Sequence, residues 1–259
     1  MRLLLLALVL LAPALAVRAQ MPADTIPPHP AQPLPETNIY AIETPRGRLI
    51  VRLFDDTPIH RDNFKRLVQE AFYDSTAFHR VIEGFMIQGG DPNSRDTIAT
   101  NDGQGDPGYS VPAEIGHLHV RGALAAARQP DEINPRRASS GSQFYIVQGR
   151  AIPPHYLRQM EARVQLATGD STFAYTPEAA DRYAEQGGAP FLDGQYTVFG
   201  ELVEGGDVLD ALAAVDTPRK RGEQGPLIDR PTERLWMVIR PLEEYTPPAP
   251  ETAAPETDR

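Results

Sequence analysis

The chain has 259 residues, of which 41% are hydrophobic and 7% aromatic, so it can bury one core of generous size or two small ones. Its formal net charge of −10 argues against a nucleic-acid partner, because phosphates require a basic surface. The absence of cysteine excludes thiol catalysis, disulfides and cysteine-ligated metal clusters.

The N-terminus predicts a segment that directs export. Arg2 is followed by an apolar run from Leu3 to Val17, and small residues lead up to Ala19 in the pattern of a cleavage site. The run is shorter than the about 20 residues that span a bilayer. We therefore expect a signal peptide over residues 1–19 and an exported mature protein, periplasmic or secreted, without stable membrane insertion. An uncleaved membrane anchor is the alternative.

Proline-rich segments flank the expected globular domain. Residues 20–37 and residues 244–259 are both rich in proline. Because proline fixes φ and lacks a backbone donor, we expect an extended linker at the first and a disordered tail at the second. A single domain is therefore expected over residues 38–243.

The domain opens with a predicted β-hairpin and a helix. Residues 38–44 and 48–54 flank the turn P-R-G, and the second strand alternates Leu49, Val51 and Leu53 with Arg48, Ile50 and Arg52. Thr57 as a cap and Pro58 at the first helical position predict a helix start. The buried face of this helix is expected to comprise Ile59, Phe64, Leu67, Val68 and Ala71.

Further strands and one more core helix follow. The strand candidates read F-H-R-V-I, G-A-L-A-A-A, S-Q-F-Y-I-V, Y-T-V-F-G-E-L-V and R-L-W-M-V-I. In the first of these, alternation predicts that Phe78, Arg80 and Ile82 share one face, with His79 a scaffold residue on the other. Residues 207–215 predict an amphipathic helix that buries Val208, Leu209, Leu212 and Val215. Many short strands with two core helices predict a mainly β, closed barrel capped by helices.

Residues 149–190 interrupt this series of strands. Two polar helical patterns, each opened by proline, lie between two strand candidates. We expect a helical insertion on the surface of the barrel.

One short segment combines unusual chemical groups. Residues 78–91 read F-H-R-V-I-E-G-F-M-I-Q-G-G-D, and they contain a cation, an aromatic ring, a thioether and an amide without a serine or cysteine nucleophile. The segment resembles the signature of the cyclophilin-type peptidyl-prolyl cis-trans isomerases. Four further segments match the family in order: G-D-P-G-Y-S-V-P-A-E-I, R-G-A-L-A-A-A-R, S-G-S-Q-F-Y-I and F-L-D-G-Q-Y-T-V-F-G.

The resemblance implies a fold and an activity. The implied fold is an eight-stranded antiparallel barrel closed by two helices. The implied activity is rotation of Xaa-Pro peptide bonds, which needs neither a cofactor nor a metal. The expected partners are proline-containing unfolded or flexible polypeptides that fold after export, and we expect the protein to act as a monomer.

The resemblance also implies roles for individual residues. Arg80 corresponds to the catalytic arginine and Gln88 to the glutamine that binds a substrate carbonyl. The proline pocket corresponds to Phe85, Met86, Tyr145 and Leu192. A groove for the substrate backbone corresponds to Ala127, Arg128, Gln129 and Gln143. Phe191 and Tyr196 are two further positions expected to bind substrate. Departures from the family occur at both, where tryptophan and histidine respectively are common, and at Tyr145, where phenylalanine is usual.

Three other interpretations stay open at the level of sequence. The first is a module or chaperone that binds proline-rich segments with little catalytic role, and the second is a structural envelope protein. The third concerns His117 and His119, whose spacing would suit two ligands on one strand face, with Glu114 as the nearest third ligand. The turn residues around them favour a loop instead of a metal site. A simpler alternative for the hydroxyl of Tyr145 is a structural contact with a neighbouring backbone group.

Overall fold

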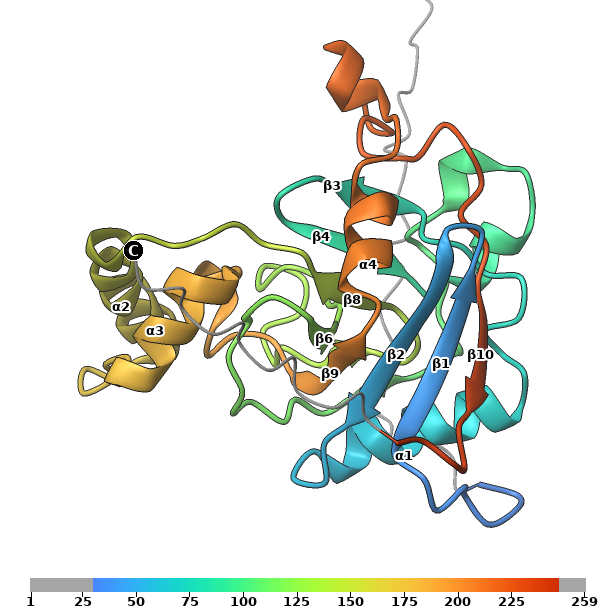
Figure 1. Ribbon diagram of the computed structural model, residues 1–259, viewed down its shortest axis with the longest axis horizontal. Coiled ribbons are helices and arrows are strands. Elements are labelled where there is room, and N and C mark those ends of the chain that lie inside the picture. The colour runs from blue at the N-terminus through green and yellow to red at the C-terminus, as the bar shows by residue number, and fades with distance from the viewer. Residues whose placement is uncertain (1–29, 247–259) are drawn as a thin grey trace, which may run out of the picture.

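A computed structural model describes residues 30–246 as a mainly β structure around one large antiparallel sheet (Figure 1). The predicted signal peptide, the first part of the linker and the end of the tail lie outside the described residues. Within residues 30–246, no helix has both the length and the apolar character needed to cross a bilayer.

Eight strands form the large sheet in the order β10-β1-β2-β9-β6-β8-β4-β3. The separate pair of β5 and β7 is also antiparallel. The strands are β1 (Ile39–Thr44), β2 (Gly47–Leu53), β3 (Arg80–Ile82), β4 (Met86–Gly89), β5 (Ser110–Val111), β6 (Ala123–Ala126), β7 (Ser139–Ser140), β8 (Phe144–Val147), β9 (Val198–Glu204) and β10 (Val238–Pro241).

The two edges of the large sheet approach each other. Ala77 and Trp236, which precede β3 and β10, form an isolated antiparallel bridge. The amide of Phe78 donates to the carbonyl of Leu235 at 2.9 Å, and the amide of Met237 donates to the carbonyl of Thr76 at 2.8 Å. The sheet therefore curls until its edges meet at this bridge, whereas continuous strand pairing around a closed ring stays a prediction.

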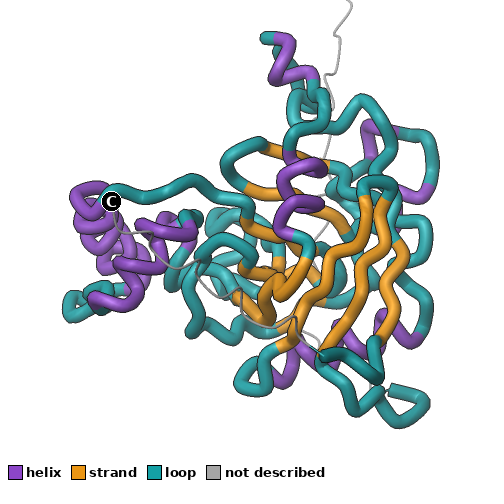
Figure 2. Tube along the Cα trace, in the orientation of Figure 1, coloured by secondary structure: helices purple, strands orange, loops and turns teal. Residues whose placement is uncertain are grey.

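Four α-helices and four short 3-10 helices complete the described structure (Figure 2). Helices α1 and α4 pack against the sheet, whereas α2 and α3 form the predicted insertion and lie apart from it in Figure 1. The α-helices are α1 (Pro58–Gln69), α2 (Pro154–Thr168), α3 (Pro177–Gln186) and α4 (Gly206–Ala213). The 3-10 helices are η1 (Pro92–Arg95), η2 (Ala99–Asn101), η3 (Pro190–Leu192) and η4 (Pro218–Arg221).

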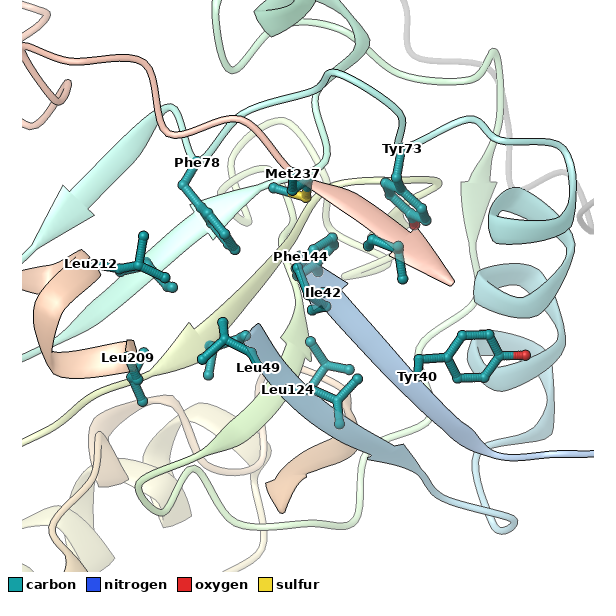
Figure 3. Packing of buried hydrophobic residues seen from close by; sticks show 14 of the residues in the cluster. Tyr40, Ile42, Leu49, Tyr73, Phe78, Leu124, Phe144, Leu209, Leu212 and Met237 are labelled. Carbon is teal, nitrogen blue, oxygen red and sulfur yellow. The ribbon is translucent and has the colours of Figure 1, made fainter. Parts of the chain in front are cut away.

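The main core lies inside the curl of the sheet, under α1 and α4 (Figure 3). Phe64 of α1 is at its aromatic centre, with ring centroids of Tyr40, Tyr73, Phe144 and Phe199 within 5.9 Å. The helix is therefore fixed to four separate segments of the chain through one side chain.

Helix α1 differs from its prediction at both ends. Thr57 is the N-cap residue, but its side chain makes no capping hydrogen bond. Glu114 accepts hydrogen bonds from the amides of Ile59 and His60 instead, at 3.1 and 2.9 Å. The prediction that Ile59 and Ala71 are buried is wrong, because Ile59 faces solvent and Ala71 follows the helix with φ of 53°.

Two strand predictions also need correction. Ile50 was expected on the exposed face of β2, but it is buried, although Val51 and Leu53 are buried and Arg52 is exposed as alternation predicts. Phe78 was expected to share a face with Arg80. Because β3 begins only at Arg80, Phe78 precedes the strand and packs into the main core.

The aromatic packing around Phe64 predicts a large stability effect. Phe64→Ala should lower the free energy of unfolding by about 3–5 kcal/mol, because it leaves a cavity that four rings cannot fill. Denaturant titration measures the change. Leu166→Ala on α2 is the control, since this side chain is 87% exposed and its loss should change stability by less than about 0.5 kcal/mol. Equal losses in both variants would contradict this view of the core.

Candidate active site

The strand register places the candidate residues in one row across the sheet. Arg80 of β3 lies opposite Gln88 of β4, Gln88 lies opposite Tyr145 of β8, and Tyr145 lies opposite Ala125 of β6. In the adjacent row, Ile82 lies opposite Met86, and Met86 lies opposite Val147. Residues from four strands therefore reach the same face of the sheet, although 45 positions separate Arg80 from Ala125 in the sequence.

Alternation along these strands separates the main core from a second apolar cluster. Leu124, Phe144 and Ile146 point into the main core. Ala125, Tyr145 and Val147 belong to the second cluster on the opposite face, together with Met86 and, at its margin, Phe85, Leu192 and Tyr196. Ala123 and Ala125 of β6 are buried within this second cluster.

A cleft of about 570 Å³ opens over this second cluster. All the candidate site residues line it except Phe191, namely Arg80, Phe85, Met86, Gln88, Ala127, Arg128, Gln129, Gln143, Tyr145, Leu192 and Tyr196. Phe191 is instead 36% exposed and packs against Phe85, with ring centroids 5.3 Å apart. The structure thus brings together segments that the sequence separates by more than a hundred residues.

Polar side chains along one wall of the cleft form a chain of hydrogen bonds. Arg80 donates from Nη1 to Oε1 of Gln88 at 3.2 Å, and Gln88 donates from Nε2 to Oε1 of Gln143 at 3.2 Å. Gln143 donates in turn to the carbonyl of Gly105 at 2.8 Å. This chain fixes which end of each amide faces the cleft, because each glutamine uses its carbonyl as an acceptor and its amino group as a donor.

Asp229 is a partner of Arg80 that the sequence did not indicate. Its Oδ2 lies 3.5 Å from Nε of Arg80, and its Oδ1 bonds to Arg219. The carbonyl of Asp229 also accepts a hydrogen bond from the amide of Val81 at 2.8 Å. The loop that holds Asp229 is therefore attached to the edge of β3, and its carboxylate holds one side of the Arg80 guanidinium while Nη1 bonds to Gln88. No local pattern links positions 80 and 229, so only the fold reveals the pair.

Arg128 contributes both its side chain and its main chain to the cleft. Its guanidinium lies over the ring of Tyr196, 4.4 Å from the centroid, and it bonds to the carbonyl of Gln195 and to Asp131. The main-chain groups of Ala127 are both bonded, to Gln143 and to Ser140. Among the described residues, the amide and carbonyl of Arg128 have no hydrogen-bond partner. The main chain of Arg128 is therefore the part of this segment that can pair with a peptide.

The two histidines considered as metal ligands have other partners. His117 lies 2.9 Å from Asp56, and His119 is bonded to Asp193 at 2.8 Å and to the hydroxyl of Tyr145 at 3.0 Å. The residues that the structure describes contain no group of three or more side chains suited to a metal ion. The alternative in which the Tyr145 hydroxyl points to a backbone group is wrong, because its partner is the imidazole of His119.

A second polar cluster resembles a hydrolytic triad in its connections. Nδ1 of His60 lies 2.6 Å from Glu114, and Nε2 lies 2.9 Å from Oγ of Ser139. Ser139 is only 2% exposed and does not line the cleft. Because Glu114 also bonds the first amides of α1, we assign this cluster to anchoring the helix.

His79 is a buried titratable group at the cleft. It is 7% exposed, and neither ring nitrogen has a hydrogen-bond partner among the described residues. Burial lowers the pKa of its imidazole below the ordinary value of 6.5, although Asp91 and Asp102 oppose the shift. The ring therefore stays neutral, and it lines the same cleft as Arg80 instead of facing away from it, so its scaffold role stays a prediction.

Comparisons with known proteins agree on a family. The family profile described as "Cyclophilin type peptidyl-prolyl cis-trans isomerase/CLD" matches residues 39–233. A Staphylococcus epidermidis protein described as a peptidyl-prolyl cis-trans isomerase is 34% identical over 175 residues, which cover 66% of this chain and 79% of that protein. A Streptococcus pyogenes protein described as a bifunctional phosphatase and peptidyl-prolyl cis-trans isomerase is 40% identical over 209 residues. The match covers 79% of this chain but only 38% of that longer protein.

Solved structures show the same fold. The crystal structure of a cyclophilin-type isomerase from Cryptosporidium parvum superposes with a TM-score of 0.53 at 24% identity, covering 79% of this chain and 98% of that one. The same protein crystallised in the presence of the dipeptide Ala-Pro gives a TM-score of 0.52.

The buried neutral state of His79 predicts how stability depends on pH. Below about pH 6.5 the unfolded chain takes up a proton that the folded chain resists, so the free energy of unfolding should fall as the pH is lowered. When the pH is lowered from about 7.5 to about 5, the free energy of unfolding should fall more for wild type than for His79→Leu. Denaturant titration at each pH measures it. His155→Leu, at an exposed position on α2, should keep the wild-type slope. If His79→Leu had the same pH slope as wild type, this account of the buried imidazole would be wrong.

Proposed function

The chain belongs to the cyclophilin-type peptidyl-prolyl cis-trans isomerases, and on that premise we propose that the cleft rotates Xaa-Pro bonds of exported polypeptides and so assists their folding. Arg80 is the catalytic residue in this proposal, Gln88 holds a substrate carbonyl, and Phe85, Met86, Tyr145 and Leu192 hold the prolyl ring. The observation that carries it is the row of Arg80, Gln88 and Tyr145 across β3, β4 and β8, which faces one cleft with a polar and an apolar wall.

The reaction breaks no covalent bond. An Xaa-Pro amide rotates over a barrier of about 18–20 kcal/mol, and without catalysis it takes tens to hundreds of seconds. An enzyme accelerates it by binding the twisted amide more tightly than either planar form. In the twisted amide the prolyl nitrogen recovers its lone pair, so a donor aimed at that nitrogen acts mainly on the transition state.

Arg80 has the properties that such a donor needs. Its guanidinium is permanently charged and its donors are fixed in one plane. Gln88 accepts a hydrogen bond from Nη1, and Asp229 forms an ion pair with the group on the side of Nε, which limits its rotation. The side chain stays 44% exposed, so its remaining donors can reach a peptide in the cleft.

The apolar wall holds the ring while the rest of the peptide turns. Met86 is 1% exposed and Tyr145 5% exposed, so both are supported from behind by other side chains. The free main-chain groups of Arg128 would pair with the backbone of the residue before proline. A peptide held at its ring and at its backbone can rotate only about the bond between them.

Removing the arginine should abolish most of the activity. Arg80→Ala should lower kcat/KM for a proline peptide by about 100- to 1,000-fold, the loss expected when one donor to a transition state is removed. Arg80→Lys should recover only part of this, because an ammonium keeps the charge but not the planar set of donors. Exchange of the peptide between cis and trans forms, followed by NMR, measures the rate.

The control for this experiment is Arg48→Ala. Arg48 lies on β2 in an exposed pair with Glu43, and such pairs contribute little. The exchange rate with the Arg48→Ala variant should equal that with wild type. An Arg80→Ala variant as active as wild type would remove Arg80 from the mechanism, and a wild-type rate equal to that in buffer would remove the proposed function.

The exported location is proposed from the N-terminal sequence and is tested separately. Full-length protein produced in a Gram-negative bacterium should appear in the periplasm with its N-terminus after Ala19. Leu10→Arg places a charge in the apolar run and should keep the chain in the cytoplasm, whereas Leu10→Ile should not. Cell fractionation and intact mass distinguish the outcomes. An uncleaved wild-type chain in the membrane fraction would favour an anchor, and one in the cytoplasm would contradict export.

A further inference from the structure

The helical insertion is joined to the proline pocket through buried polar side chains. Tyr175 and Tyr183 belong to the insertion, and Tyr183 is fully buried on α3. Leu157 of α2 packs with Tyr183 and Val120 in a small core of its own. The insertion is therefore not a free surface element, because it shares a core with the segment that contains His119.

Asp193 lies where the insertion meets the pocket. It directly follows the pocket residue Leu192 and is 1% exposed. Its Oδ2 accepts hydrogen bonds from the hydroxyls of Tyr175, at 2.8 Å, and Tyr183, at 2.5 Å. Its Oδ1 accepts from the amide and from Nδ1 of His119, both at 2.8 Å. Both oxygens of one buried carboxyl group are thus used, one by the insertion and one by His119.

These bonds indicate the direction of the protons between the insertion and Tyr145, and the Tyr175 hydroxyl has a second acceptor in the carbonyl of Pro190, at 3.2 Å. Burial and the neighbouring Asp193 raise the pKa of both Tyr175 and Tyr183, so both phenols remain donors. With Oδ1 of Asp193 as its acceptor, Nδ1 of His119 carries the proton, and Nε2 is left as an acceptor. The hydroxyl of Tyr145 then donates to Nε2 at 3.0 Å. Tyr145 therefore directs its proton away from the cleft.

The backbone around this series allows little movement. Gly188, just after α3, bridges to Val120 and to Arg150, and the amide of Ala189 donates to the carbonyl of His119 at 2.8 Å. A Cβ atom on Gly188 would lie 2.4 Å from the carbonyl oxygen of His119 and 2.6 Å from the ring of Tyr183. Only glycine allows the end of the insertion to approach so closely.

We propose that Tyr175, Tyr183 and Asp193 are positioning residues for the proline pocket, acting through His119 to hold the ring of Tyr145 in place. The insertion in this view is a part of the enzyme that orients its pocket. That the Tyr145 ring receives a proline rests on the function proposed above.

The Tyr145 hydroxyl is the group through which His119 acts on the Tyr145 ring. A tyrosine ring is free to turn about its Cα–Cβ and Cβ–Cγ bonds unless packing or a bond at its far end prevents it. The rings of His119 and Tyr145 are nearly parallel, with an interplanar angle of 13°. Tyr196 packs edge-on against both, so a turn of one ring would displace a second wall of the cleft.

The test removes hydroxyl groups at the far end of the series. Tyr175→Phe combined with Tyr183→Phe keeps both rings and removes both donors to Oδ2 of Asp193. We expect kcat/KM for an Ala-Pro tetrapeptide to fall roughly three- to tenfold, mostly through weaker peptide binding, since loss of a buried hydrogen bond changes an equilibrium by about that factor. Wild type should show a protonated Nδ1 and an unprotonated Nε2 of His119 by ¹⁵N NMR, and the double variant a mixture of both tautomers.

A Tyr145→Phe background separates positioning from loosening of the fold. Without the Tyr145 hydroxyl, the hydrogen bonds through Asp193 and His119 no longer reach the Tyr145 ring. Adding Tyr175→Phe and Tyr183→Phe should then change kcat/KM by less than about 1.5-fold. Equal losses with and without that hydroxyl would overturn the proposal, as would unchanged peptide binding in the double variant. Tyr156→Phe is the matched control, because among the described residues the Tyr156 hydroxyl on α2 makes no hydrogen bond.

Failure of the proposed function would look different. If wild type bound the peptide but did not accelerate its cis-trans exchange, the proposed isomerase activity would be contradicted. The dissociation constants of the same variants would then decide the positioning role. If wild type bound no peptide at all, both proposals would be overturned. Thermal unfolding of each variant confirms that the assay temperature lies below its transition.

Discussion

The antiparallel register of β3, β4, β8 and β6 is the constraint on which the rest of the site depends. Because side chains alternate between the faces of a strand, one register sends Phe144 and Ile146 into the core and Tyr145 and Val147 to the cleft. A shift of one residue would exchange these sets. The stability of the core and the geometry of the cleft are therefore two consequences of the same hydrogen bonds.

The polar groups around the cleft follow a consistent arrangement. Arg80 is held at two of its nitrogens, by Gln88 and by Asp229, and it still faces solvent. Asp193 is buried and fully bonded, with partners from the insertion and from His119. A partly bonded buried carboxyl group would be costly, so its four donors make the burial tolerable. Rigid support behind an exposed donor is the arrangement that preorganised catalysis requires.

Much of the fold and the cleft could be predicted from local patterns. The hairpin of β1 and β2, the helices α1 and α4 and the helical insertion all leave a period, a turn signal or a proline start in the sequence. The residues of the cleft were found through ordered segments that resemble a family, and the structure brings all but Phe191 to its wall. Errors occurred at Ile59 and Phe78, where a helix or a strand begins, and at Ile50, on the face of β2 that was expected to be exposed.

The sequence by itself determined where strands and helices form, which faces they bury and which family the chain resembles, because these depend on side chains close together in the chain. Only the tertiary structure decided the partners of the polar groups. Asp229 reaches Arg80 from 149 positions away, and Asp193 reaches His119 from 74 positions away. Such pairs have no period and no fixed spacing, so they exist only once the sheet has curled and the insertion has packed against it.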